Sequence, residues 1–251
     1  MGFDTPEIIA LLALAAFVAG FVDSIAGGGG LLTVPALLLA GATPVQALAT
    51  NKLQGLFGAA SATYTYASKG HVDVRSQWPA ALLAFAASAI GAFAITQLPT
   101  DAIRPALPFL LIAVAAYFWL KPGLNDVDRV RRLSPLVFML TIVPLIGFYD
   151  GIFGPGTGSF FMLAFVLLAG QGMLKATAHT KALNFASNVG GFVIFASAGA
   201  VLWKIGLIMG AAQLVGAQVG ARVAIAGGAK IIRPLLVVVC VAMAIRLWTS
   251  G

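Results

Sequence analysis

The sequence predicts an all-α fold, a polytopic membrane helix bundle of about ten helical segments in two repeats with glycine-broken helices. Three observations predict it. First, 60% of the 251 residues are apolar and only 9% are charged, with a mean hydropathy of +0.99. Second, apolar runs of membrane-spanning length recur along the chain, and third, two stretches of sequence repeat each other. A water-soluble globule of this length needs more polar surface, so lipid must be the solvent for most of the chain.

The individual helices follow from the apolar runs. A hydrocarbon core about 30 Å thick needs about 20 residues of helix. Runs of about this length predict helices at 7–25, 44–68, 77–98, 101–120, 134–149, 176–202, 203–226 and 229–249. Shorter apolar segments at 30–41 and 157–170 complete the set.

The two halves of the sequence match each other. Gly20 to Asp23, followed by Gly27 and Gly29, matches Gly147 to Asp150, followed by Gly154 and Gly156. The same order continues with Lys52 and Lys181, Gly91-Ala92 and Gly216-Ala217, Ile103-Arg104-Pro105 and Ile232-Arg233-Pro234, and Trp119 and Trp248. We therefore predict one repeat unit at 1–120, a polar cytoplasmic linker at 121–133, and a second repeat unit at 134–251.

The distribution of basic residues bears on the orientation of the repeats. The second unit is inverted if each unit crosses the membrane an odd number of times, and parallel if each glycine-broken pair crosses once. Inversion leaves Arg104, Lys204 and Arg246 outside and places the larger basic set in the cytoplasm, so the positive-inside bias favours it over the parallel arrangement. That larger set is Lys69, Arg75, Lys121, Arg129, Arg131, Arg132, Lys175, Arg222, Lys230 and Arg233.

The glycine-rich breaks are the first candidate binding elements. One follows Asp23 and includes Gly28, Gly29 and Gly30; the other follows Asp150 and includes Gly156, Thr157 and Gly158. An unwound backbone is tolerated in a membrane only where protein covers it or a polar cavity meets it. Short helices that begin at the breaks direct free N–H groups towards them, which suits an anion. The alternative is that the glycines only allow helices to cross closely.

Two polar helix faces are the second candidate. The helix at 44–68 carries Asn51, Lys52 and Gln54, and the helix at 176–202 carries Thr180, Lys181, Asn184 and Asn188. Spacings of three and four residues place Asn51 with Gln54, and Lys181 with Asn184 and Asn188, on one face. A lysine within a span is expensive and typically marks a translocation path. Alternatively, both lysines extend to the membrane surface or form structural ion pairs with Asp23 and Asp150.

Acidic residues are scarce in the apolar segments. Asp23 and Asp150 lie just before the two breaks, where we expect them to carry a coupled proton or to pair with the lysines. His179 is a further candidate for proton coupling, because an unperturbed imidazole titrates near neutral pH.

Several classes of function lack the residues they need. No nucleophile turn, nucleotide-binding loop or paired catalytic carboxylates occur, so the sequence predicts no enzyme. The single Cys240 and the isolated histidines predict no metal site or other cofactor. The net charge of +7 lies in short connections without an aromatic-basic face, so nucleic acid is not an expected partner.

The motifs resemble those of the TauE/SafE sulfite exporter family, also called the TSUP group, across essentially the whole chain. The resemblance depends on the Gly-Phe-Val-Asp-Ser-Ile-Ala-Gly-Gly-Gly-Gly stretch at 20–30, Ala-Thr-Asn-Lys at 49–52, the Gly-x-x-Asp-Gly stretch at 147–151, and His-Thr-Lys at 179–181. It implies a multi-pass transporter of the bacterial inner membrane for sulfite, sulfoacetate or another small anion, moved with the proton gradient. The second unit departs from the first at Pro155 and Thr157, where the first has Gly28 and Gly30.

The sequence therefore favours a secondary transporter of a small anion, with the lipid bilayer as its surroundings. An anion channel with the same lysine-lined site is the alternative, although repeats with broken helices are more typical of transporters. The sequence predicts neither the identity of the anion, nor export or import, nor the oligomeric state.

Overall fold

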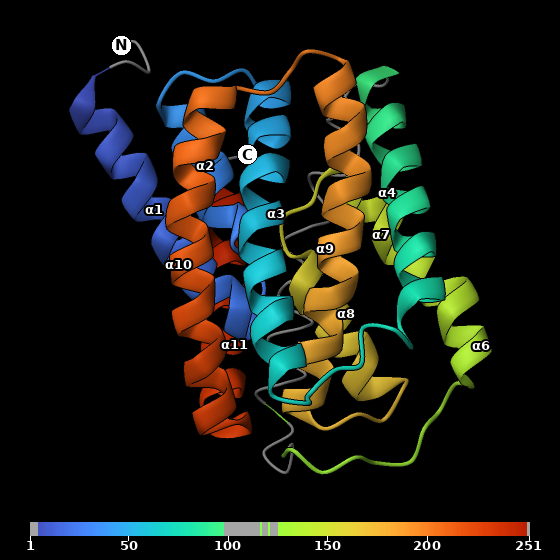
Figure 1. Ribbon diagram of the computed structural model, residues 1–251. Helices are drawn as coiled ribbons and strands as arrows, with labels where there is room; N and C mark the ends of the chain where they lie inside the picture. Colours follow the sequence, from blue (N-terminus) through green and yellow to red (C-terminus); the bar gives the residue numbers. More distant parts are fainter. Residues whose placement is uncertain (1–4, 98–115, 117–119, 121–124, 250–251) are drawn as a thin grey trace.

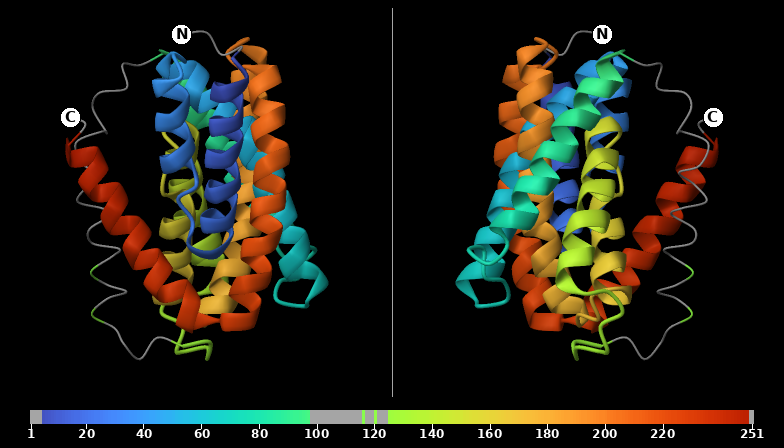
Figure 2. Two further views of the ribbon diagram at one scale, coloured as in Figure 1. Left: turned by 90° about the vertical axis from the view of Figure 1, so that its left-hand side faces the viewer. Right: turned by 90° about the vertical axis from the view of Figure 1, so that its right-hand side faces the viewer.

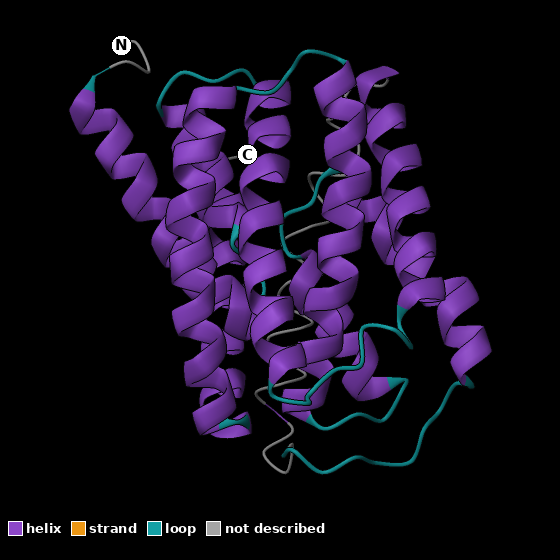
Figure 3. Cartoon of the chain, in the orientation of Figure 1, coloured by secondary structure: helices purple, strands orange, loops and turns teal. Residues whose placement is uncertain are grey.

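The computed structural model describes residues 5–97, 116, 120 and 125–249, and every regular element among them is helical (Figure 3). The all-helical prediction is confirmed for this part of the chain. The predicted helix at 101–120 falls almost entirely outside the described residues. In order, the elements are α1 (Pro6–Ala26), α2 (Gly30–Leu39), α3 (Pro44–Ser68), α4 (Trp78–Gln97), α6 (Pro135–Val137), α7 (Val143–Ile152), α8 (Thr157–Leu167), α9 (Met173–Ser197), α10 (Trp203–Gly227) and α11 (Ala229–Thr249).

Four of the described helices are long and apolar enough to cross a membrane by themselves. They span Pro6–Ala26, Trp78–Thr96, Pro135–Ile152 and Trp203–Gly227. The third is continuous from α6 to α7 through a π-helical turn at Phe138–Ile142. Helices α3 and α9 have 25 residues each, about 37 Å at 1.5 Å per residue, but carry too many polar residues to resemble isolated spans.

The burial pattern shows where those polar residues go. The interior holds Lys52, Lys181, Asn51 and Asn184, whereas large apolar side chains such as Leu39, Phe93 and Leu145 are exposed on the outside. A soluble protein has the opposite pattern. An apolar exterior around a polar interior is expected of a bundle whose surroundings are lipid.

The helices of the two halves of the chain interlock. Helix α1 packs against α10, α7 packs against α4, and α3 packs between α9 and α10. Glycines allow these close approaches: a Cβ atom added at Gly216 of α10 would collide with the backbone of α1, and one at Gly91 of α4 would collide with that of α7. Gly91 and Gly216 are matched positions of the sequence repeat, so the same crossing occurs twice.

The ribbon also shows the direction of each element (Figure 1). The α1–α2 hairpin starts and ends at the end of the molecule that carries the N-terminus, whereas the α7–α8 pair starts and ends at the opposite end. Helix α3 runs away from the N-terminal end and α9 runs towards it. Figure 2 shows the same arrangement from the two sides.

Several predicted helix boundaries were wrong by three residues or more. The helix predicted at 134–149 continues to Ile152, and the one predicted at 157–170 ends at Leu167. The helix predicted at 176–202 begins earlier, at Met173, and ends at Ser197. It ends there because Gly199 has a φ of +68°, a left-handed conformation that terminates helices. After this turn, the backbone N–H of Leu202 donates to the hydroxyl of Thr50 at 3.1 Å, so the released chain is held against α3.

The part of the predicted linker that the structure describes is packed against helix ends. The Asp126 carboxylate accepts hydrogen bonds from the N–H groups of Leu174, at 2.9 Å, and Ala229, at 3.0 Å, and thereby caps both α9 and α11. Asp128 accepts from the N–H of Gly172 at 2.8 Å and pairs with Lys175 at 2.6 Å. This segment therefore fixes the ends of the second-half helices and is more than a connection.

Candidate functional site

The two glycine breaks meet inside the bundle. In the first, Gly27 and Gly28 have φ values of +81° and +90°, and α2 begins at Gly30. In the second, Gly154 and Gly156 have φ values of +83° and +89°. Only glycine adopts this region without strain, which is why both breaks are glycine-rich. The sequence prediction that the four-glycine run interrupts the helix is confirmed, although Gly30 is itself helical.

The contact between the breaks is direct. A Cβ atom built on Gly27 would lie 2.5 Å from the amide nitrogen of Ser159 and 2.6 Å from the carbonyl carbon of Gly158. The Ser159 hydroxyl donates to the carbonyl oxygen of Ala26 at 3.0 Å. Any side chain at Gly27 would therefore push the N-terminus of α8 away from the end of α1.

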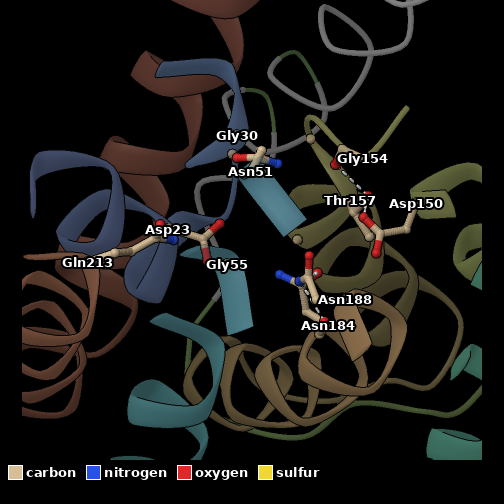
Figure 4. A pocket seen from close by; sticks show the side chains of 13 residues that line it. Asp23, Gly30, Asn51, Gly55, Asp150, Gly154, Thr157, Asn184, Asn188 and Gln213 are labelled. Carbon is tan, nitrogen blue, oxygen red and sulfur yellow. Dashed lines mark hydrogen bonds between the residues drawn. The ribbon is translucent and has the colours of Figure 1, made fainter. Parts of the chain in front are cut away.

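A small cavity of about 30 Å³ lies where the breaks meet (Figure 4). By volume it holds about two water molecules. Its lining comes from both halves of the chain: Asp23, Gly28, Gly30, Asn51, Gly55, Asp150, Gly154, Gly156, Thr157, Gly158, Asn184, Asn188 and Gln213.

The two lysines form crossed ion pairs beside this cavity. Lys52 Nζ lies 2.8 Å from Asp150 Oδ2, and Lys181 Nζ lies 3.1 Å from Asp23 Oδ2. Each pair joins the two halves of the chain. Both lysines occupy the ninth position of a 25-residue helix, and both are almost fully buried. Extension of their ammonium groups to the membrane surface is therefore excluded.

The aspartates receive further hydrogen bonds from the breaks themselves. Asp150 Oδ1 accepts from the Thr157 hydroxyl at 2.8 Å, and Asp23 Oδ1 accepts from the Gly29 N–H at 3.1 Å. Each carboxylate therefore stabilises the start of the short helix that follows it, where the helix dipole favours negative charge. This contact explains why each aspartate precedes its break.

Side-chain amides complete the lining of the cavity. Asn51 Oδ1 accepts from Thr33 Oγ1 at 2.7 Å and from Gln54 Nε2 at 3.0 Å. With its oxygen occupied twice, Asn51 turns its Nδ2 donor towards Gly30. Asn188 Nδ2 donates to the backbone oxygen of Asn184 at 2.7 Å. These bonds fix the orientation of the cavity amides before any ligand arrives.

The remaining predicted site residues lie farther from the cavity. Gln54 supports Asn51 from behind. Thr180 is fully buried in α9, and its hydroxyl has no hydrogen-bond partner within the described residues. His179 is not part of the cavity lining: its Nδ1 lies 2.7 Å from Gln171 Oε1, and its ring packs 5.6 Å from that of Phe165.

The sequence analysis missed Gln213 of α10. Gln213 is 4% exposed, lines the cavity, and has an Oε1 atom without a hydrogen-bond partner in the described part of the chain. Its side chain passes closely over Gly20 and Gly58, where a Cβ atom would collide with it. A polar residue within a strongly apolar span was the available signal.

Nothing in the described residues forms a metal-binding cluster of three or more His, Cys, Asp or Glu side chains. The lining supplies side-chain amides, the Thr157 hydroxyl, backbone groups of the two breaks and the carboxylates of Asp23 and Asp150. The ammonium groups of Lys52 and Lys181 are not part of the lining and lie against these carboxylates. Once released from the carboxylates, ammonium groups beside backbone and amide N–H donors can bind an oxyanion.

Comparisons with known proteins agree with this architecture. The family model described as "Sulfite exporter TauE/SafE" matches residues 12–247. The chain is 63% identical over 241 residues to a "Probable membrane transporter protein ORF9" from Sinorhizobium sp., covering 96% of this chain and 92% of that protein. It is 44% identical to probable membrane transporter proteins of Haemophilus influenzae and Escherichia coli, over 96% and 97% of this chain and 94% and 90% of theirs. No solved structure matches the chain.

Proposed function

Because the chain belongs to the sulfite exporter TauE/SafE family of membrane transporters, we propose that it is a secondary transporter that moves a small anion through the cavity between its glycine breaks. The anion is sulfur-containing or an organic sulfonate, and its movement is coupled to the proton gradient. The crossed ion pairs carry this proposal, because they place a lysine ammonium group against each of the two carboxylates that line the cavity.

The chemistry of the cavity supports an anion as the substrate. Lys52 Nζ lies 3.3 Å from a Cβ atom built on Gly154, and Lys181 Nζ lies 3.3 Å from one built on Gly158, so both ammonium groups border the second break. The N-terminal ends of α2 and α8 add backbone N–H groups and positive dipole ends. An anion that enters this space competes with the aspartates for the same lysines.

The size of the cavity supports a small substrate. At about 30 Å³ it has room for about two water-sized groups, so only part of a sulfite or sulfonate group fits here, and the whole anion needs a wider state of the transporter. The donors that line it converge from four helices and both breaks, which is the arrangement that an oxyanion needs.

Proton coupling follows from the same pairs. A carboxylate that takes up a proton loses its charge and releases its lysine, which is then available to the anion. One proton and one anion then enter the site together, and its total charge does not change. We assign this role to the Asp23 and Asp150 pair of carboxylates; His179 lies too far from the cavity lining to compete directly with them.

We propose that the two repeat units, 1–120 and 134–251, are inverted about the cavity, with 121–133 as the cytoplasmic linker. The opposite directions of α3 and α9 support this arrangement. Most basic residues in the described part of the chain lie at the helix ends nearest the linker, which the positive-inside rule places in the cytoplasm of a bacterial inner membrane. Lys204, at the start of α10, lies at the other end.

The proposal is tested with purified protein reconstituted into liposomes. Thermal unfolding is first measured with sulfite, sulfate, thiosulfate and sulfoacetate, because an anion at 100 times its Kd raises the free energy of unfolding by about 2.7 kcal/mol. Uptake of each stabilising anion is then measured with and without a pH gradient. Saturating uptake that follows the gradient supports a coupled transporter, whereas a non-saturating current driven by voltage supports the channel.

The variant Lys181→Ala tests whether the anion binds at the proposed site, and Lys69→Ala is the matched control. Lys69 is exposed at the end of α3 and far along the helix from the breaks. Lys181→Ala should weaken anion binding at least about tenfold, since hydrogen bonds to charged groups contribute about 1.5–3 kcal/mol, while Lys69→Ala should leave it unchanged. Equal binding by both variants would place the anion site elsewhere.

A further inference from the structure

The two ion pairs are matched in the sequence repeat but not in their surroundings. The side chain of Asp150 is 3% exposed and that of its partner Lys52 is 2% exposed. The side chain of Asp23 is 14% exposed, although its partner Lys181 is fully buried. Both carboxylates line the cavity, but that of Asp23 is more exposed to it than that of Asp150.

The hydrogen bonds of the two aspartates also differ, and Asp150 is again the more tightly held. Asp150 has Lys52 on one oxygen and the Thr157 hydroxyl, at 2.8 Å, on the other. The position that matches Thr157 in the first repeat is Gly30, so Asp23 has no hydroxyl partner there or elsewhere in the described residues, and it accepts instead from the Gly29 N–H at 3.1 Å. Asp23 is thus held by longer contacts than Asp150.

A third difference comes from the helices that cross behind each aspartate. Gln213 precedes Gly216 by three residues in α10, and Ser88 precedes the matching Gly91 by three residues in α4. Gln213 lines the cavity and packs against Gly20, one turn before Asp23. Ser88 does not line the cavity and packs against Gly151. Only the Asp23 side of the cavity therefore has an additional amide (Figure 4).

We propose that the two pairs have different roles: Lys52–Asp150 is a fixed structural pair, and Asp23 is the carboxylate that exchanges Lys181 for the anion. This inference rests on the proposed function. In the exchange, Asp23 takes up one proton, its ion pair with Lys181 opens, and the Lys181 ammonium pairs with the entering anion. Gln213, whose Oε1 has no hydrogen-bond partner within the described residues, is a second polar group on the Asp23 side of the cavity (Figure 4).

Among the charged and titratable groups near Asp23, we assign the change of protonation to Asp23 itself. Helix α9 presents Lys181, and α3 presents Tyr66, whose hydroxyl donates to the Ser24 carbonyl oxygen at 2.9 Å and is fully buried. Across the cavity lies the enclosed Lys52–Asp150 pair. Neither α2 nor α8 carries a titratable residue. On α10 and α11, Arg222 and Lys230 are exposed, Lys204 lies at the far end, and Arg233 lies in the second turn of α11.

The test compares Asp23→Asn with Asp150→Asn, two changes that each remove one negative charge. Binding of sulfate and sulfoacetate, which do not titrate near neutral pH, is measured by calorimetry across a series of pH values. Wild-type affinity should fall by up to about tenfold for each unit of pH rise over the range in which binding takes up a proton, because one proton is bound with each anion. Asp23→Asn should bind at every pH with the affinity the wild type reaches in acid, without this slope.

Asp150→Asn should retain the slope if it folds, and should lower the midpoint of thermal unfolding much more than Asp23→Asn. If it does not fold, the double variant Lys52→Met with Asp150→Leu replaces it, since it removes the same carboxylate without leaving Lys52 unpaired and should leave the slope intact. A slope that survives in Asp23→Asn, or disappears in Asp150→Asn or in the double variant, overturns the division of roles while leaving anion transport in place. Absence of binding of either anion by the wild type would instead contradict the proposed function, and this inference with it.

Discussion

Replacement of Lys52 by methionine should destabilise the protein strongly, because it leaves Asp150 as an unpaired charge in the interior. The two groups are 2.8 Å apart and only 2% and 3% exposed. Removal of one partner from a buried ion pair costs about 3–5 kcal/mol, whereas replacement of both by apolar groups of similar volume is often neutral. Since Asp150 keeps the Thr157 hydroxyl as a partner, the lower part of that range is expected.

The double variant Lys52→Met with Asp150→Leu separates charge from packing. Neither charge is then left alone, and the Thr157 hydroxyl retains the Gly154 carbonyl oxygen as an acceptor. Thermal unfolding of the purified protein in detergent is the assay. At roughly 2–4 °C per kcal/mol for a chain of this size, the single variant should lose on the order of 10 °C, and the double variant only a few degrees.

Two results would refute this reasoning. A single variant that unfolds within about one degree of the wild type would mean that water or another group compensates Asp150. The unfolding midpoint of the double variant is also compared with those of Lys52→Met and Asp150→Leu measured separately. If its loss equals the sum of those two losses, the residues act independently and the pair has no coupling energy. In the expected case, the double variant folds, so its anion binding can be measured without interference from unfolding.

Three other perturbations test the site and its supports. Gln213→Leu should weaken anion binding about tenfold by calorimetry, because one amide is lost from the cavity, and unchanged affinity would exclude Gln213 from the site. Asp126→Ala removes two helix caps at about 1 kcal/mol each, so it should lower the unfolding midpoint without altering affinity. Hydrogen bonds from Lys175 and the Gly172 N–H lower the pKa of Asp128 below its ordinary value. The contribution of Asp128 to the free energy of unfolding is therefore present at neutral pH and is lost as the pH falls through that lowered pKa. This loss should be small because the Asp128–Lys175 pair is exposed, and it should be absent in Asp128→Asn.

Helix positions were largely predictable because lipid imposes a length and a composition on each span. The runs at 44–68, 203–226 and 229–249 agree with α3, α10 and α11 to within one residue. The end of α9 was not predictable in the same way. The apolar character of the chain continues past Ser197, and only the backbone conformation of Gly199 stops the helix there.

Much of the candidate site was predictable because polar residues in an apolar span have few alternatives to facing inward. The repeat identified Asp23, Lys52, Asp150 and Lys181 as matched groups. Their crossed pairing was not predictable, since spacing along one helix carries no information about which half of the chain supplies the partner. Gln213 was missed for a related reason: its matching residue is Ser88, so it lies outside the repeat pattern.

Each crossed ion pair joins one half of the chain to the other, so a change in the charge of either pair affects how the two halves are held together. Lys52 on α3 pairs with Asp150 on α7, and Lys181 on α9 pairs with Asp23 on α1. A movement of one half away from the other at either pair therefore lengthens the N–O distance of that pair. If Lys52–Asp150 stays closed, it acts as the pivot, and the Lys181–Asp23 side is the one that opens. In the exchange that we propose, neutralisation of Asp23 by a proton would remove the attraction that holds this side shut, and the anion would supply the replacement charge for Lys181. On this hypothesis, the asymmetry that begins with Thr157 in one break and Gly30 in the other would decide on which side of the cavity a coupled movement starts.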